Sequence, residues 1–244
     1  MGVKTSSQAA FAALFIGLGI QGLITRDFTT VWQPVPRTAP LREVLVYACA
    51  LLSLTAGVGL LVRRTAAVAA RALLVALCVW LVVWRLRPLF TAALIESTWS
   101  LADTLVMTAG ACVLFAWLAS KRDRDLRIAR VLYGLGMIPF GYAHFANVPG
   151  TAGLVPHWLP WHVGWAYFTG ATFVAAGIAI LVGAFARLAA ALSAVQMGLF
   201  GLLIWVPILM SGPTNAFQRM EFATTVALTI AGWVVADSYR GVSL

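Results

Sequence analysis

The chain has 244 residues, of which 61% are hydrophobic and only 10% are charged. Soluble domains are about half apolar and roughly a quarter charged, so this composition excludes an ordinary soluble protein and predicts a membrane protein. The net charge is +9, but the basic residues stand at the ends of apolar runs. That placement is typical of membrane loops in contact with the lipid bilayer, and it argues against nucleic acid as a partner.

Eight apolar runs follow one another along the chain. Each has roughly the 20 residues that a helix needs to cross a bilayer core about 30 Å thick. Backbone groups in lipid must be paired internally, and the short alternating segments of a barrel are absent from the sequence, so the runs are expected to be helices. We therefore expect an all-α polytopic membrane protein with eight transmembrane helices. The runs are Ala9–Thr25, Arg42–Val62, Ala66–Trp84, Trp99–Ala119, Ile128–Ala146, His162–Val182, Ala186–Met210 and Met220–Ala236.

The basic residues predict how the chain lies across the membrane. If the N-terminus is cytoplasmic, the loops on that side contain most of the Lys and Arg residues, including the cluster from Lys121 to Arg130. Arg85 and Arg87 are then counted in an outside loop. Because cytoplasmic loops are enriched in Lys and Arg, both termini are expected to be cytoplasmic.

The two halves of the chain resemble each other. Matching residues recur at a nearly constant spacing, which predicts two four-helix units, residues 1–120 and 126–244, arranged as two tandem parallel four-helix bundles. In each unit the first outside loop is rich in Trp and Pro, and we expect it to fold back over its bundle. The matching pairs include Gly17 and Gly134, Phe28 and Phe145, Tyr47 and Tyr167, and Gly57 and Gly177.

Small residues predict one close helix contact. Helices in lipid approach each other through small side chains, and two neighbouring runs carry such residues at a spacing of one helical turn. We expect these two helices to pack along their small residues. The stripes are Ala171, Ala175, Ala179 and Gly183 in one run, and Ala186, Ala190, Ala194 and Gly198 in the next.

Ionisable residues within the runs are the candidate ligand-binding groups, because such residues are costly in lipid. Asp103 and Glu221 are corresponding residues in the outer halves of their runs, although either carboxylate could simply complement a helix dipole. Asp27 and His144 also correspond. His144 could hydrogen-bond a loop carbonyl, or it could bind a carbonyl of an apolar ligand such as a quinone. The candidates are His144, Asp103, Glu221, Asp27, Tyr142, Trp158, Trp161, His162 and Tyr167. No metal is expected, since the spacings typical of metal-binding histidines are absent from the sequence.

The second half contains a set of short motifs: Gly134-x-Gly136, Phe140-Gly141-Tyr142-Ala143-His144-Phe145, Val155-Pro156-His157-Trp158-Leu159-Pro160, Tyr167-Phe168-Thr169-Gly170 and Ala176-Gly177. Together these motifs resemble the DoxX family of small four-helix membrane proteins. The first half resembles a diverged copy, so the whole chain is similar to double-length members.

This resemblance implies a location in the bacterial inner membrane. It also implies a quinone-linked or redox-associated subunit that binds an apolar ligand near the outer face and has a partner redox subunit. No catalytic motif can be transferred, so whether the chain is itself catalytic stays open. The alternatives are a non-enzymatic scaffold subunit and, third, a small-molecule transporter. A transporter needs a polar path, and few charged residues lie in the inner halves of the runs.

Overall fold

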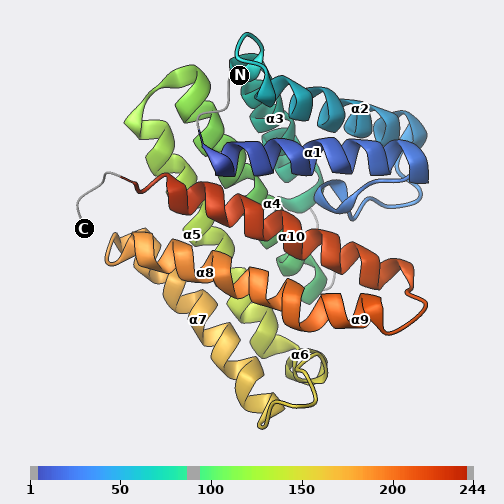
Figure 1. The fold of residues 1–244 in the computed structure, drawn as a ribbon, viewed down its shortest axis with the longest axis vertical. Helices are drawn as coiled ribbons and strands as arrows, with labels where there is room; N and C mark the ends of the chain where they lie inside the picture. The colour runs from blue at the N-terminus through green and yellow to red at the C-terminus, as the bar shows by residue number, and fades with distance from the viewer. Residues whose placement is uncertain (1–4, 87–93, 241–244) are drawn as a thin grey trace.

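The computed structural model describes residues 5–86 and 94–240, which form helices and loops without a strand. In Figure 1 some helices run at small angles to one another across the view, and others cross them steeply. The α-helices are α1 Ser6–Thr25, α2 Arg42–Leu61, α3 Ala66–Trp80, α4 Leu94–Phe115, α5 Asp123–Ala146, α6 Val148–Gly153, α7 His162–Val182, α8 Ala186–Phe200, α9 Val206–Met210 and α10 Ala216–Asp237. Shorter pieces are the 3-10 turn η1 Thr30–Trp32 and the π-helical segments η2 Leu81–Leu86, η4 Ala116–Ser120 and η5 Gly201–Trp205.

Seven helices of the described chain are long and apolar enough to cross a membrane. They confirm an all-α, multi-pass membrane protein. The fifth apolar run lies in α5, which has 24 residues but begins with a charged segment that includes Asp123 and Asp125. The seven are Ser6–Thr25, Arg42–Leu61, Ala66–Leu86, Thr98–Ser120, His162–Val182, Ala186–Met210 and Ala216–Asp237.

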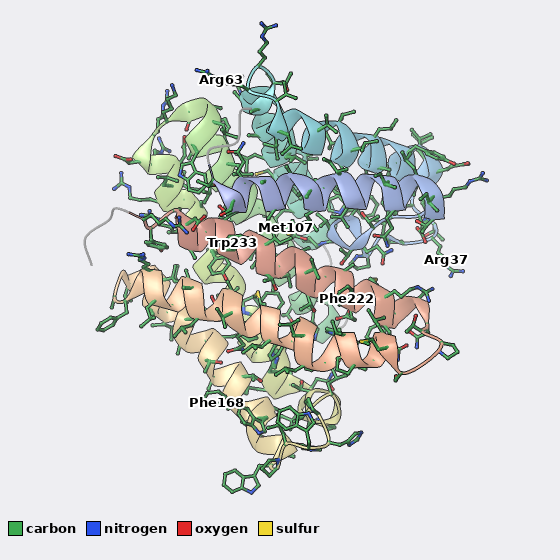
Figure 2. All side chains as sticks on the ribbon, viewed as in Figure 1. Arg37, Arg63, Met107, Phe168, Phe222 and Trp233 are labelled. Atoms are coloured by element: carbon green, nitrogen blue, oxygen red, sulfur yellow. The ribbon has the colours of Figure 1, made fainter. Side chains whose placement is uncertain are left out.

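The two predicted bundles share one core. The central helix α4 packs mainly along α5 and α10, and α10 also packs along α1 (Figure 1). The last helix of the first half thus contacts the first helix of the second half, and the last helix of the second half contacts the first helix of the chain. One cluster of buried residues accordingly includes Phe11 of α1, Met107 of α4 and Val234 of α10. Figure 2 shows Met107 at the centre of the molecule, whereas Arg37 and Arg63 lie at its edges.

Glycines let the first two helices of each half approach closely. A Cβ added to Gly19 of α1 would lie 2.5 Å from the backbone nitrogen of Leu54 in α2. In the second half, a Cβ on Gly141 of α5 would lie 2.5 Å from the carbonyl oxygen of Gly170 in α7. Both pairs of helices therefore depend on backbone-to-backbone contact, as is typical of helices in lipid.

The expected packing of α7 on α8 along small residues is wrong. In α7, Ala171 and Ala175 are exposed, because this helix turns Gly170, Phe173 and Gly177 towards α5 instead. The stripe in α8 is buried, but it faces α10. A Cβ on Gly232 of α10 would lie 3.0 Å from the Cβ of Ala194. The larger contact of α7 with α5 determines which face of α7 is buried.

The two Trp- and Pro-rich loops adopt different positions. In the first, Trp32 is 1% exposed, and its Nε1 donates to Oγ of Ser53 in α2 at 2.9 Å. In the second, Trp158 and Trp161 are 70% and 85% exposed. The expectation that each loop folds over its own bundle holds for the first loop, whereas the tryptophans of the second stay at the surface. We call the end of the helices that bears these loops the outer end, following the predicted orientation.

Candidate functional site

His144 lies in the last turns of α5, and its side chain is buried. Its Nδ1 is 2.8 Å from the carbonyl oxygen of Phe140, one turn earlier in the helix. A carbonyl oxygen can only accept a hydrogen bond, so Nδ1 carries the proton and the neutral ring presents Nε2 as an acceptor. Among the described residues, no hydrogen bond to Nε2 of His144 is found. The imidazole therefore has one tethered side and one side that can accept a proton.

Aromatic rings from three other helices surround this imidazole. The centroid of the His144 ring lies 5.2 Å from that of Trp99 in α4, 5.3 Å from that of Phe173 in α7 and 6.1 Å from that of Phe200 in α8. Phe140 completes the cluster, with ring centroids 5.8 Å from Trp99 and 5.6 Å from Phe173. We refer to these five residues as the His144 box. Such surroundings suit a flat, apolar ligand that also offers one polar atom.

Two carboxylates approach each other one helical turn beyond the box. Asp103 follows Trp99 by one turn of α4 and is half-buried. It lies within electrostatic range of both Glu221 of α10 and the guanidinium of Arg85. The structure thus places Asp103 and Glu221 on two helices that pack together, and Trp99, one turn from Asp103 in α4, contacts His144 of the box.

Arg85, which the sequence placed in an outside loop, is instead a buried residue of η2. Its side chain is 1% exposed. Nε donates to Oγ1 of Thr104 in α4 at 2.8 Å, Nη1 donates to the carbonyl oxygen of Pro34 at 3.0 Å, and Nη2 donates to that of Gln33. Arg85 therefore attaches the first loop to α4 beside the carboxylates. Its place directly after the apolar segment Val82–Trp84 is the signal that could have indicated burial.

The remaining candidates lie outside the box. Asp27 is exposed and pairs with Arg42 at 2.6 Å. Tyr142 and Tyr167 are exposed on the apolar surface, where the Tyr167 ring stacks on Phe145 with centroids 6.1 Å apart. The second loop holds a separate cluster, in which the rings of His162 and His157 are 6.3 Å apart. Trp158 and Trp161 belong to the same exposed loop.

Within residues 5–86 and 94–240, no group of three or more His, Cys, Asp or Glu side chains is arranged to hold a metal ion. The ring neighbours of His144 given above are Trp99, Phe173 and Phe200, and none of these side chains is a metal ligand.

Comparison with known proteins finds one family that part of the second half resembles. Residues 126–206 match the family model of DoxX. This DoxX segment includes α5, α7 and α8, so it contains His144, Phe173 and Phe200 of the box. Trp99, Asp103 and Glu221 lie outside it. No curated protein and no solved structure matches the chain. The resemblance found in the sequence is confirmed for residues 126–206, and its extension to a double-length chain stays a prediction.

Proposed function

We propose that this protein is a quinone-linked membrane subunit that binds the hydroquinone form of its ligand in the His144 box. The single observation that carries the proposal is the hydrogen bond between Nδ1 of His144 and the carbonyl oxygen of Phe140. This bond makes Nε2 an acceptor, so the polar atom of the ligand must be a donor. A hydroquinone hydroxyl is such a donor, and the rings of Trp99, Phe173 and Phe200 suit its flat apolar ring.

The proposed chemistry divides between this chain and a partner. When a hydroquinone is oxidised to a quinone, both hydroxyl groups lose their protons and the ring gives up two electrons. We assign the electrons to a redox centre on a partner subunit, one proton to Nε2 of His144 and the other to water at the outer end. His144 then acts as a general base, a role that suits a neutral imidazole.

The topology is part of the same proposal. We infer that α5 is an eighth crossing, because its 24 residues are long enough and it packs along α4 and α7, which are both apolar enough to span. An even number of crossings places both termini on the same side. The basic cluster from Lys121 to Arg130 favours the cytoplasm for that side. The DoxX resemblance supports a bacterial inner membrane.

A second candidate function is a scaffold without a ligand. The exposed aromatic rings of Trp158 and Trp161 in the second loop and of Phe168 in α7 favour it, because large exposed rings can contact a partner subunit. Figure 2 shows Phe168 projecting outwards from α7. A scaffold predicts that the purified protein binds no hydroquinone but retains its partner during purification.

The experiment compares two ligands and two variants of the full chain in a neutral detergent. A water-soluble hydroquinone and its dimethyl ether, which lacks both O–H donors, are titrated against the native protein, His144→Phe and the control His162→Phe. Loss of one neutral hydrogen bond should weaken hydroquinone binding to His144→Phe by about tenfold. The ether should bind the native protein as weakly as the hydroquinone binds that variant. Equal binding of hydroquinone and ether to the native protein would overturn the proposal.

A further inference from the structure

An open hollow of about 230 Å³ lies where η4 meets α5, at the end of the helices opposite the His144 box. Its lining consists of Ala116, Trp117, Lys121, Arg122, Asp123 and Leu126. The π-helical segment η4 ends at Ser120, and the chain reverses through Lys121, which has a φ of 55°. This turn places two cationic side chains next to an apolar floor.

Within the residues that the structure describes, the cations around the hollow have no ion-pair partner. Lys121, Arg122, Arg124 and Arg127 are all exposed. In the described parts of the chain, the ion pairs found join Arg42 to Asp27 and Arg240 to Asp237, so none engages these four residues. The lining contains one acid, Asp123, against Lys121 and Arg122. Its net charge is positive, so it suits an anion.

The position of the hollow indicates which anion it suits. The hollow adjoins the end of the membrane-capable helix Thr98–Ser120. Ala116, Trp117 and Leu126 form an apolar surface beside the cations. A phospholipid has the matching order of groups, with an anionic phosphate next to acyl chains, and basic hollows at helix ends suit acidic headgroups. A free phosphate ion would satisfy the cations but would leave the apolar floor in contact with water.

We propose that this hollow binds the headgroup of an anionic phospholipid, with Lys121 and Arg122 at the phosphate and the first carbons of the acyl chains over Trp117 and Leu126. The site is independent of the proposed hydroquinone site, which lies at the other end of α5. The occupant is defined by net negative charge, so phosphatidylglycerol should bind and phosphatidylcholine with the same acyl chains should not.

The test uses native mass spectrometry of the full chain in neutral detergent with added dioleoyl phosphatidylglycerol or dioleoyl phosphatidylcholine. One double variant is Lys121→Asn with Arg122→Gln, in which Asn tolerates the left-handed backbone at the turn. The matched control is Arg63→Gln with Arg64→Gln, which removes two exposed cations from the loop between α2 and α3. We expect the first double variant to bind phosphatidylglycerol about tenfold more weakly and the control to bind it as the native protein does.

Three outcomes would overturn the proposal. An equal loss of phosphatidylglycerol binding in both double variants would mean that binding depends on the overall charge of the protein. Equal affinity of the native protein for the two lipids would remove the preference for an anion. Thermal stabilisation by inorganic phosphate alone, equal to that by phosphatidylglycerol and lost in the Lys121 and Arg122 variant, would replace the lipid by a free ion. Because both residues are exposed, the variant is expected to fold, and its elution volume in size-exclusion chromatography checks this.

Discussion

The outer ends of the two halves, which the predicted repeat pairs with each other, are filled by different side chains. In the first half, Trp32 inserts from the loop, donates to Ser53 and packs edge-on against Trp80, with ring centroids 5.2 Å apart. At the spacing of the predicted repeat, Ser53 corresponds to Phe173, and Trp80 corresponds to Phe200. In the second half the rings of Phe173 and Phe200 contact His144, a residue of α5. The loop residues Trp158 and Trp161 stay exposed.

The difference concerns hydrogen bonding as well as shape. Trp32 has its indole N–H bonded to Ser53, and its carbonyl oxygen accepts from Nε1 of Trp80 at 3.1 Å. The first half thus uses its own loop to satisfy the polar groups at this position. In the second half, Nε2 of His144 has no hydrogen bond among the described residues. The first outer end therefore satisfies its indole N–H within its own half, whereas the acceptor Nε2 of His144 is the atom to which the proposed function assigns a ligand.

The loop tryptophans give the most direct test of the difference between the two outer ends. Trp32→Ala removes a fully buried ring and the indole N–H that donates to Ser53, while the backbone carbonyl that accepts from Trp80 remains. Because the loss is mainly that of the ring, the free energy of unfolding should fall by about 4 kcal/mol. Trp161→Ala removes a ring that is 85% exposed, and its effect should stay within about 0.5 kcal/mol. Unfolding in detergent, followed by circular dichroism, measures both. Similar losses would show that the second loop is as tightly packed as the first.

The attachment of the first loop is the next point to test. Arg85→Met leaves the carbonyl oxygens of Gln33 and Pro34 and the hydroxyl of Thr104 without their donor. Buried groups that lose a charged partner should cost about 3 kcal/mol in the same unfolding measurement. Arg37→Met is the control, because Arg37 is exposed, and it should change stability by less than about 0.5 kcal/mol. If Arg85→Met proved as stable as the control, the anchoring role of Arg85 would be wrong.

Two glycine contacts test whether the first two helices of each half pack in the same way. Gly19→Ala places a methyl group 2.5 Å from the backbone of Leu54, and Gly141→Ala places one 2.4 Å from the side chain of Val174. Each should destabilise the protein by about 2 kcal/mol, because neighbouring backbone must move. Gly17→Ala is the control, since a Cβ there has no neighbour within 4 Å. A loss in only one half would show that α1–α2 and α5–α7 do not pack in the same way.

The sequence could predict the helices because a long apolar run in lipid can satisfy its backbone only as a helix. The sequence could also predict that Asp103 and Glu221 lie at the same end of the helices, because the predicted topology places both at the outer ends of their helices. It could not predict which face of α7 is buried, because small residues occur on more than one face and only the neighbouring helix decides between them. The burial of Arg85 was missed because basic residues at the ends of apolar runs were assigned to loops, although its place directly after Val82–Trp84 was a signal for burial.

The tautomer of His144 depends on local geometry that no spacing shows. The ring reaches the carbonyl oxygen of Phe140 within its own helix, and this contact determines that Nε2 accepts rather than donates. The aromatic partners Trp99, Phe173 and Phe200 come from three different helices. Their meeting is a property of the packing, so the sequence could name His144 but not most of its surroundings.

The smallest expected effect concerns the contact between the two halves. The hydroxyl groups of Thr30 in the first loop and Thr224 in α10 form a hydrogen bond. Thr30→Val, Thr224→Val and the double variant form a double-mutant cycle, and the coupling energy should be about 1 kcal/mol. Thr224 also donates to the carbonyl oxygen of Met220 at 3.0 Å, so the single changes alone cannot isolate the pair. Coupling near zero would mean that the first loop is held by Trp32 and Arg85 within its own half. Clear coupling would show that α10 also supports it, which follows from a core that both halves share.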